Sequence, residues 1–100
     1  MTEKVNYTVY ILLCENNSYY TGYTDNLDKR VKSHVDGTGQ CKYTRSFKPV
    51  RVAQSWGIHG TKAVAMQVER FIKSRTRAQK DALIMDPDSL FELMSTASLV

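Results

Sequence analysis

Two β-prone runs separated by a short polar turn constrain the fold of this chain more than any other feature. The first run, YTVYILL at residues 7–13, is β-branched and aromatic, and it stops at the polar segment CENNS. The second run, YYTGYT at residues 19–24, follows immediately and holds three of the chain's six tyrosines. This pattern predicts a β-hairpin that turns at Asn16 and Asn17.

A helix is predicted directly after the hairpin. Thr24 or Asp25 is placed to cap it, and apolar residues at four-residue spacing from Leu27 onwards give it one apolar face. Gly37 is the predicted end of this helix. Residues 36–49, rich in Gly and Ser and ending in Pro, predict a loop in which basic and aromatic residues alternate.

The second half of the chain adds one strand and two or three helices. VRVAQSW at residues 50–56 alternates well enough to be a third strand, and GIHG is predicted to close it. Apolar periodicity predicts helices over residues 61–74 and 76–85. The order β-β-α-β-α-α predicts an α+β fold, with a small three-stranded, mainly antiparallel sheet flanked by helices.

One compact domain fits a chain of 100 residues with 42% hydrophobic content. We expect this domain to span residues 1–85, with residues 86–100 as a C-terminal extension that can form a short helix after Asp86-Pro87. The N-terminal segment lacks the pattern of a secretion signal, and no apolar run approaches the length of a membrane span. We therefore expect an intracellular protein, cytoplasmic in a bacterium and nuclear or cytoplasmic in a viral or eukaryotic setting.

The two cysteines, Cys14 and Cys41, predict neither a disulfide framework nor a zinc site. They lack CxxC spacing, and no His/Cys cluster lies beside them. We expect both thiols to be reduced, with Cys14 acting as a small core residue.

Positive charge is concentrated in the middle of the chain. Residues 29–80 hold thirteen of the fourteen Lys and Arg residues but only two acidic residues, Asp36 and Glu69. Such an excess is typical of a polyanion binder, because each basic side chain set against a phosphate releases a counterion. A solvated basic surface without a partner is the alternative.

Short motifs at defined spacing resemble those of a nuclease family. Thr8-Val9-Tyr10 precedes Tyr20-Thr21-Gly22, and Arg30, His34 and Glu69 follow on predicted helices. Over roughly residues 7–85 this arrangement resembles the GIY-YIG nuclease superfamily. The segments YTGYT at 20–24, KYTR at 42–45 and E-x-x-x-K at 69–73 make it look most like the small stand-alone branch.

The resemblance implies a metal-dependent endonuclease that hydrolyses phosphodiester bonds in DNA. It casts Glu69 as the ligand of a single Mg²⁺ or Mn²⁺ ion, a hard cation that prefers oxygen ligands. Arg30 would contact the scissile phosphate, and His34 would assist the base or hold the water. Each residue also has a plain structural interpretation: an i,i+4 ion pair with Lys73 for Glu69, a solvent-facing position for Arg30, and a packed, hydrogen-bonded core position for His34.

The family role of the tyrosines depends on the hairpin register. The resemblance casts Tyr10 as the general base or the residue that orients the attacking water, and Tyr20 as a hydrogen-bond partner of water or phosphate. Because side chains alternate along a strand, both hydroxyl groups share a face if Gly22 lies opposite Tyr10. A slip by one residue would separate them, and strand tyrosines otherwise serve as packing residues. We expect Tyr19 and Tyr23 to pack on the opposite face.

The expected partner is DNA, single-stranded or branched rather than a specific duplex, because no sequence-reading module accompanies the nuclease-like domain. A catalytically weak or inactive nucleic-acid-binding module that uses the same basic face is the alternative function. Residues 86–100 could in addition mediate contact with a protein partner or a second copy. The residues expected to contact nucleic acid are Gly22, Lys42, Tyr43, Arg45, Arg70, Lys73 and Arg77.

Overall fold

Three antiparallel strands form the sheet of this protein, as predicted. The computed structural model describes residues 5–36 and 47–98. Strands β1 (Val5–Cys14), β2 (Tyr19–Thr24) and β3 (Pro49–Gly60) lie in the order β2-β1-β3, so β1 is central. The β1–β2 connection turns where Asn17 adopts a positive φ of 64°, a conformation that asparagine tolerates better than most residues.

Strand β3 is longer than predicted. We expected GIHG at residues 57–60 to close the strand, and this was wrong, because β3 continues to Gly60. Pairing with the long central strand β1 extends it: Gly57 lies opposite Thr8, and Ile58 lies opposite Tyr7. Ile58 is buried in the core, which adds a packing reason for the extension.

Four described helices follow the predicted order. They are α1 (Leu27–Asp36), α3 (Lys62–Lys73), α4 (Arg77–Met85) and α5 (Ser89–Ser98). The cap of α1 is Asn26 rather than Thr24 or Asp25, because its Oδ1 accepts a hydrogen bond from the Lys29 amide at 3.2 Å. Thr76 caps α4 in a reciprocal capping box with Gln79. No helix in the described ranges combines the length and hydropathy needed to cross a membrane.

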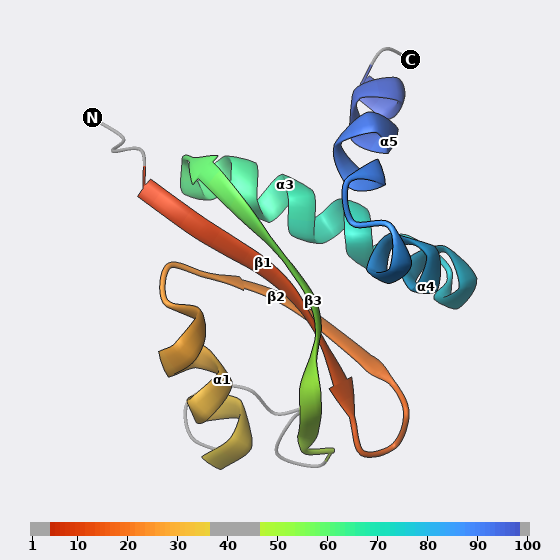
Figure 1. Cartoon of the computed structure of the whole chain (residues 1–100). Coiled ribbons are helices and arrows are strands. Elements are labelled where there is room, and N and C mark those ends of the chain that lie inside the picture. The colour runs from red at the N-terminus through yellow and green to blue at the C-terminus, as the bar shows by residue number, and fades with distance from the viewer. Residues whose placement is uncertain (1–4, 37–46, 99–100) are drawn as a thin grey trace.

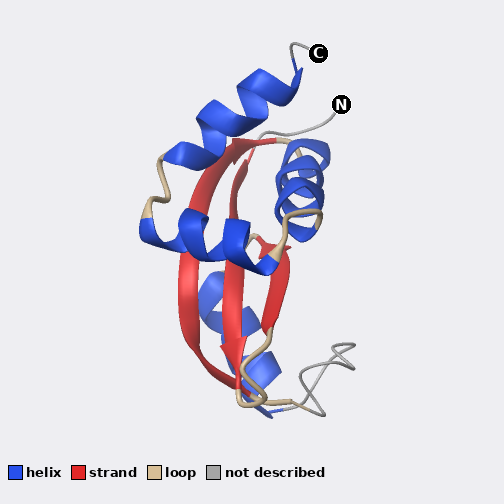
Figure 2. Cartoon of the chain, turned by 90° about the vertical axis from the view of Figure 1, so that its right-hand side faces the viewer, coloured by secondary structure: helices blue, strands red, loops and turns tan. Residues whose placement is uncertain are grey.

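Helices cover both faces of the sheet. Figure 2 shows α1 behind the strands and α4 crossing in front of them, and Figure 1 shows α3, α4 and α5 on the side of the sheet away from α1. The hydrophobic core lies between the sheet and α3 to α5. Its buried members are Val9, Ile11, Trp56, Ile58, Ala65, Val68, Ile72, Leu83 and Leu90. Cys14 is buried, as expected of a small core residue.

The C-terminal helix packs on the same core as the rest of the chain. Leu90 of α5 is fully buried within the core cluster. The indole Nε1 of Trp56 on β3 donates a hydrogen bond to the carbonyl oxygen of Pro87 at 2.8 Å. The described part of residues 86–100 is therefore joined to the sheet by both apolar and polar contacts.

Candidate functional site

The hairpin register brings the two candidate catalytic tyrosines to one face of the sheet. Tyr10 lies opposite Gly22, and Leu12 lies opposite Tyr20. Since opposite residues of an antiparallel pair share a face and side chains alternate, Tyr10, Tyr20 and Gly22 all belong to the face that α1 covers. Tyr19 and Tyr23 belong to the other face and pack against the hydrophobic core, as predicted.

Gly22 allows the ring of Tyr10 to lie across strand β2. A Cβ atom built on Gly22 would come within 2.6 Å of the Tyr10 hydroxyl oxygen and 2.8 Å of its Cζ atom. Both distances are shorter than non-bonded carbon contacts permit. The absence of a side chain at residue 22 therefore lets the Tyr10 hydroxyl reach the edge of the sheet, because β2 is an edge strand.

His34 holds that hydroxyl from the other side. Its Nε2 atom lies 2.9 Å from the Tyr10 hydroxyl oxygen, and both residues are fully buried. Burial, together with the positive charge of Arg30, lowers the pKa of His34 from 6.5 to about 4. The imidazole is thus neutral at pH 7, and in the tautomer with its proton on Nδ1 it accepts the Tyr10 proton in a hydrogen bond. The Tyr20 ring packs edge-on against the same imidazole, with centroids 4.9 Å apart.

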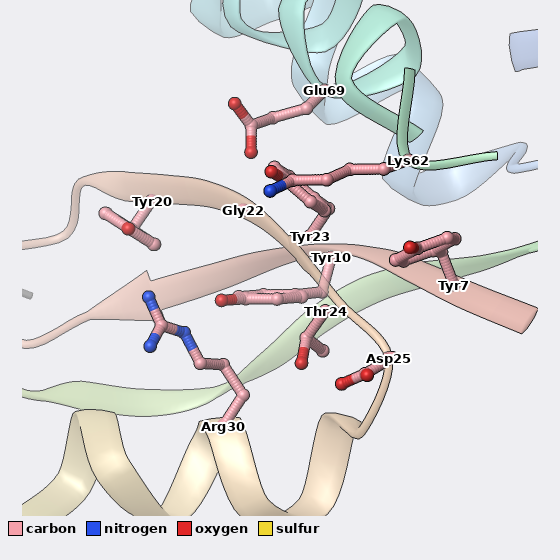
Figure 3. A pocket seen from close by; sticks show the side chains of 10 residues that line it. All are labelled: Tyr7, Tyr10, Tyr20, Gly22, Tyr23, Thr24, Asp25, Arg30, Lys62 and Glu69. Carbon is pink, nitrogen blue, oxygen red and sulfur yellow. The ribbon is translucent and has the colours of Figure 1, made fainter. Parts of the chain in front are cut away.

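Arg30 and Glu69 reach one hollow from opposite faces of the sheet. Arg30 comes from α1 and Glu69 from α3, and Figure 3 shows their side chains on the two sides of Gly22, with the Tyr10 ring between them. The hollow has a volume of about 410 Å³. The site therefore wraps around the edge strand β2 instead of lying on one face. Its lining residues are Tyr7, Tyr10, Tyr20, Gly22, Tyr23, Thr24, Asp25, Arg30, Lys62 and Glu69.

Glu69 forms an ion pair with Lys73, as the structural interpretation of this residue predicts. Its carboxylate lies 3.1 Å from the Lys73 ammonium one helical turn later. The Glu69 side chain is only 17% exposed to solvent, whereas the Lys73 side chain is 52% exposed. Glu69 is thus a largely covered carboxylate that faces the hollow and has a cation beside it, so the ion pair and a position in the site coexist.

The donor set suits a divalent ion that arrives with a substrate better than a tightly held resident metal. No group of three or more His, Cys, Asp or Glu side chains within residues 5–36 and 47–98 is arranged to hold a metal ion. Mg²⁺ commonly binds proteins through one or two carboxylates and fills its remaining positions with water and substrate phosphate oxygens. Glu69 provides one such carboxylate, and Asp25 places a second on the same hollow.

Five residues of the hollow were not among the sequence-predicted site residues: Tyr7, Tyr23, Thr24, Asp25 and Lys62. Tyr23 was expected only to pack, and it does pack edge-on against Tyr7, with ring centroids 6.3 Å apart. The position of Thr24 and Asp25 directly after YTGY, at the exit of β2, was a usable signal. Lys62 carried no such signal, because its place depends on how α3 approaches the sheet.

The residues predicted to contact nucleic acid occupy different surroundings. Gly22 lies in the hollow, and Arg70 is exposed on α3. Arg77 is held by the protein itself: it donates to the Asn17 carbonyl oxygen at 2.5 Å and lies over the Tyr19 ring, 3.8 Å from its centroid. Lys42, Tyr43 and Arg45 lie outside the described residues.

Comparison with known sequences identifies the family of this chain. The sequence profile described as the GIY-YIG catalytic domain matches residues 6–82. The chain belongs to the GIY-YIG family. Two similar family members are UPF0213 protein YazA of Bacillus subtilis, 44% identical over 84 residues, and UPF0213 protein BH0048 of Halalkalibacterium halodurans, 41% identical over 80 residues. The alignments cover 82% and 80% of this chain, and 81% and 83% of the relatives.

A solved structure places this GIY-YIG chain among the small UPF0213 proteins. The solution NMR structure of the UPF0213 protein BH0048 from Bacillus halodurans aligns with a TM-score of 0.51 at 41% identity, over 81% of this chain and 84% of that one. The predicted α+β fold of the GIY-YIG type is thereby confirmed.

Proposed function

We propose that this GIY-YIG protein is a metal-dependent endonuclease that hydrolyses phosphodiester bonds in DNA. One observation carries the proposal: Arg30 and Glu69, from helices on opposite faces of the sheet, line the same hollow as Tyr10 and Tyr20. A cation, a carboxylate and two hydroxyl groups around one space are the groups that phosphodiester hydrolysis requires.

The Tyr10–His34 pair is proposed to orient the attacking water and to accept its proton. Neutral His34 accepts a hydrogen bond from Tyr10, and Tyr10 also lines the hollow in which the water would lie. As the Tyr10 oxygen takes a proton from the water, the hydroxyl's own proton passes to Nε2 of His34. A phosphate bound at Arg30 favours this transfer, because it offsets the positive charge that helps to depress the pKa of His34.

Arg30 is proposed to bind the phosphoryl oxygens of the scissile group. Its planar guanidinium presents several N–H donors to one phosphate and stabilises the charge that grows in the transition state. Tyr20, on the same face of the sheet, is proposed to hydrogen-bond the phosphate or the water. When bound at Glu69, a divalent cation would act as a Lewis acid on the phosphate. Asp25 adds a second carboxylate to the hollow, beside the end of β2.

A single-stranded or branched substrate fits the shape of the site. The hollow lies at a sheet edge with α1 on one side and α3 on the other, so the scissile phosphate has to enter between two helices (Figure 3). A flexible strand can bend into such a space more easily than a continuous duplex can. The contacts offered there are a guanidinium, hydroxyl groups and a carboxylate, which suit the backbone and carry no direct information about base sequence.

The test compares cleavage of labelled single-stranded, duplex and branched DNA and of RNA in Mg²⁺, Mn²⁺ or EDTA. We expect cleavage of single-stranded or branched DNA that needs a divalent ion. Glu69→Gln and Tyr10→Phe should each lower the rate at least about a hundredfold, the scale of one electrostatic group in a transition state. Glu92→Gln, which removes a carboxylate of α5 that does not line the hollow, is the matched control.

Two outcomes contradict the proposal. Cleavage that persists in EDTA and in Glu69→Gln would exclude the metal-dependent mechanism. Salt-sensitive DNA binding without cleavage in any metal would instead support a binding module in which the Glu69–Lys73 ion pair is purely structural.

A further inference from the structure

A second, smaller hollow lies beside the site, on the face of the sheet that carries the hydrophobic core. It has a volume of about 180 Å³ and is lined by Tyr19, Tyr20, Thr21, Lys73 and Lys80. Tyr20 lines both hollows, so the two hollows are neighbours at strand β2. The lining comes from β2, α3 and α4, which meet beside the edge of the sheet (Figure 1).

Thr21 contributes a hydroxyl group that the protein leaves without a partner. The residue is only 4% exposed, and its Oγ1 atom is buried with no hydrogen-bond partner among the described residues. Such groups are rare in folded proteins, because a buried hydroxyl loses its water without compensation. Thr21 also lines the second hollow, so a ligand bound there lies next to the residue that carries this hydroxyl.

Two lysines give the hollow its charge. Lys80 is half-buried on α4, and Lys73 lies on α3, where its ammonium also pairs with Glu69. A second carboxylate near the hollow, Asp81, is engaged elsewhere: it accepts a hydrogen bond from the Tyr19 hydroxyl at 2.5 Å and pairs with Arg77 at 3.5 Å. Asp81 therefore does not cancel the positive charge of Lys80, whereas Lys73 is shared with Glu69.

We propose that this hollow binds the phosphate group next to the scissile one on the same DNA strand, an inference that rests on the proposed nuclease function. Lys73 and Lys80 supply the charge, the Thr21 hydroxyl donates a hydrogen bond to a phosphate oxygen, and Tyr20 separates the two phosphates. A volume of about 180 Å³ is below the usual range of pockets that hold whole small molecules, which suits a phosphate better than a whole nucleoside.

The same arrangement links strand binding to the carboxylate of the site. Lys73 is shared between Glu69 and the second hollow. A phosphate in the hollow competes with Glu69 for the Lys73 ammonium and so releases the carboxylate toward a divalent ion. Occupation of the second hollow therefore prepares the first for catalysis.

The test measures binding apart from cleavage, in EDTA, by fluorescence anisotropy of a labelled oligothymidylate over a salt series. Lys80→Ala should raise the Kd about three- to tenfold and reduce the slope of log K against log salt by about 0.7, the value for one phosphate contact on a single strand. Thr21→Val should raise the Kd about fivefold without changing the slope, since it removes one uncharged hydrogen bond. Lys32→Ala, an exposed lysine of α1 outside both hollows, is the charge-matched control.

Thermal unfolding supplies an independent check on Thr21. Because Oγ1 has no internal partner, Thr21→Val should leave the Tm unchanged or raise it while it weakens binding. A lowered Tm with unchanged affinity would overturn the proposal, as would a Lys80→Ala variant that binds like Lys32→Ala. If the unaltered protein cleaves DNA but Lys80→Ala binds DNA normally, only the proposed phosphate site in the second hollow is refuted. If the unaltered protein binds no oligothymidylate, the proposed nuclease function fails as well.

Discussion

Replacing Gly22 by alanine tests whether the absence of a side chain holds the site together. The added methyl group would lie 2.6 Å from the Tyr10 hydroxyl oxygen and 2.8 Å from Cζ, so the ring has to move. Overpacking of this kind costs about 1–3 kcal/mol. Displacing the ring also breaks the buried Tyr10–His34 hydrogen bond, which adds about 1–3 kcal/mol for groups left unsatisfied. Alanine recovers about 0.5–1 kcal/mol of backbone entropy in a strand.

The expected net loss for Gly22→Ala is about 3 kcal/mol in the free energy of unfolding, measured by urea titration, with a fall in Tm of at least about 10 °C for a chain of this size. Gly57→Ala is the matched control. Gly57 lies in strand β3 with no atom within 4 Å of an added Cβ, so its substitution should be neutral or slightly stabilising.

A double-mutant cycle identifies the cause of the loss. In a Tyr10→Leu background the atoms that meet the new methyl group are absent, so most of the Gly22→Ala penalty should disappear. The reasoning is refuted if Gly22→Ala is as mild as Gly57→Ala, or if its full penalty persists without the tyrosine ring.

Three further predictions concern stability. The pKa of His34 falls from 6.5 to about 4 on folding, so the free energy of unfolding should drop by about 2 kcal/mol between pH 7 and pH 5, as the unfolded state takes up a proton. Urea titrations should show this drop in the unaltered protein but not in His34→Gln. Arg77→Ala should lower the free energy of unfolding by about 1–2 kcal/mol, because it removes the cation–π contact with Tyr19 and the hydrogen bond to the β1–β2 turn. Arg70→Ala, in contrast, should leave the Tm unchanged and weaken DNA binding. Equal Tm values for the two variants would contradict this prediction. Leu90→Ala should cost about 2–5 kcal/mol in urea unfolding, as expected for a buried core residue, whereas a loss below 1 kcal/mol would mean that α5 contributes little to the core.

The sequence was sufficient to predict the parts of the site that depend on local pattern. Alternation along residues 7–13 and 19–24 and a turn at Asn16 and Asn17 predict a hairpin. The sequence left its register open between two alternatives, and the structure shows Tyr10 opposite Gly22. The spacing of Arg30 and His34 on one amphipathic helix was equally readable. These features involve neighbours in the chain or a single helical face.

Features that depend on tertiary packing were not predictable in the same way. The approach of α3 to the sheet edge decides that Glu69 lines the same hollow as Arg30, and no local pattern encodes that approach. The extension of β3 to Gly60 comes from pairing with β1, which overrides the turn preference of GIHG. The sequence did not predict Asn26 as the cap, because Thr24 is an equally good capping residue by type. In the structure the Thr24 hydroxyl instead accepts a hydrogen bond from the Asn26 amide at 3.1 Å.

The central position of β1 makes the mobility of the site uneven. Tyr10 lies on a strand that is hydrogen-bonded to a neighbour along both edges, whereas Arg30 and Glu69 lie on helices that each contact only one face of the sheet. Amide protons of a doubly paired strand exchange with solvent last, and those of peripheral elements exchange earlier. The floor of the hollow is therefore the part of the site whose amide protons should exchange last.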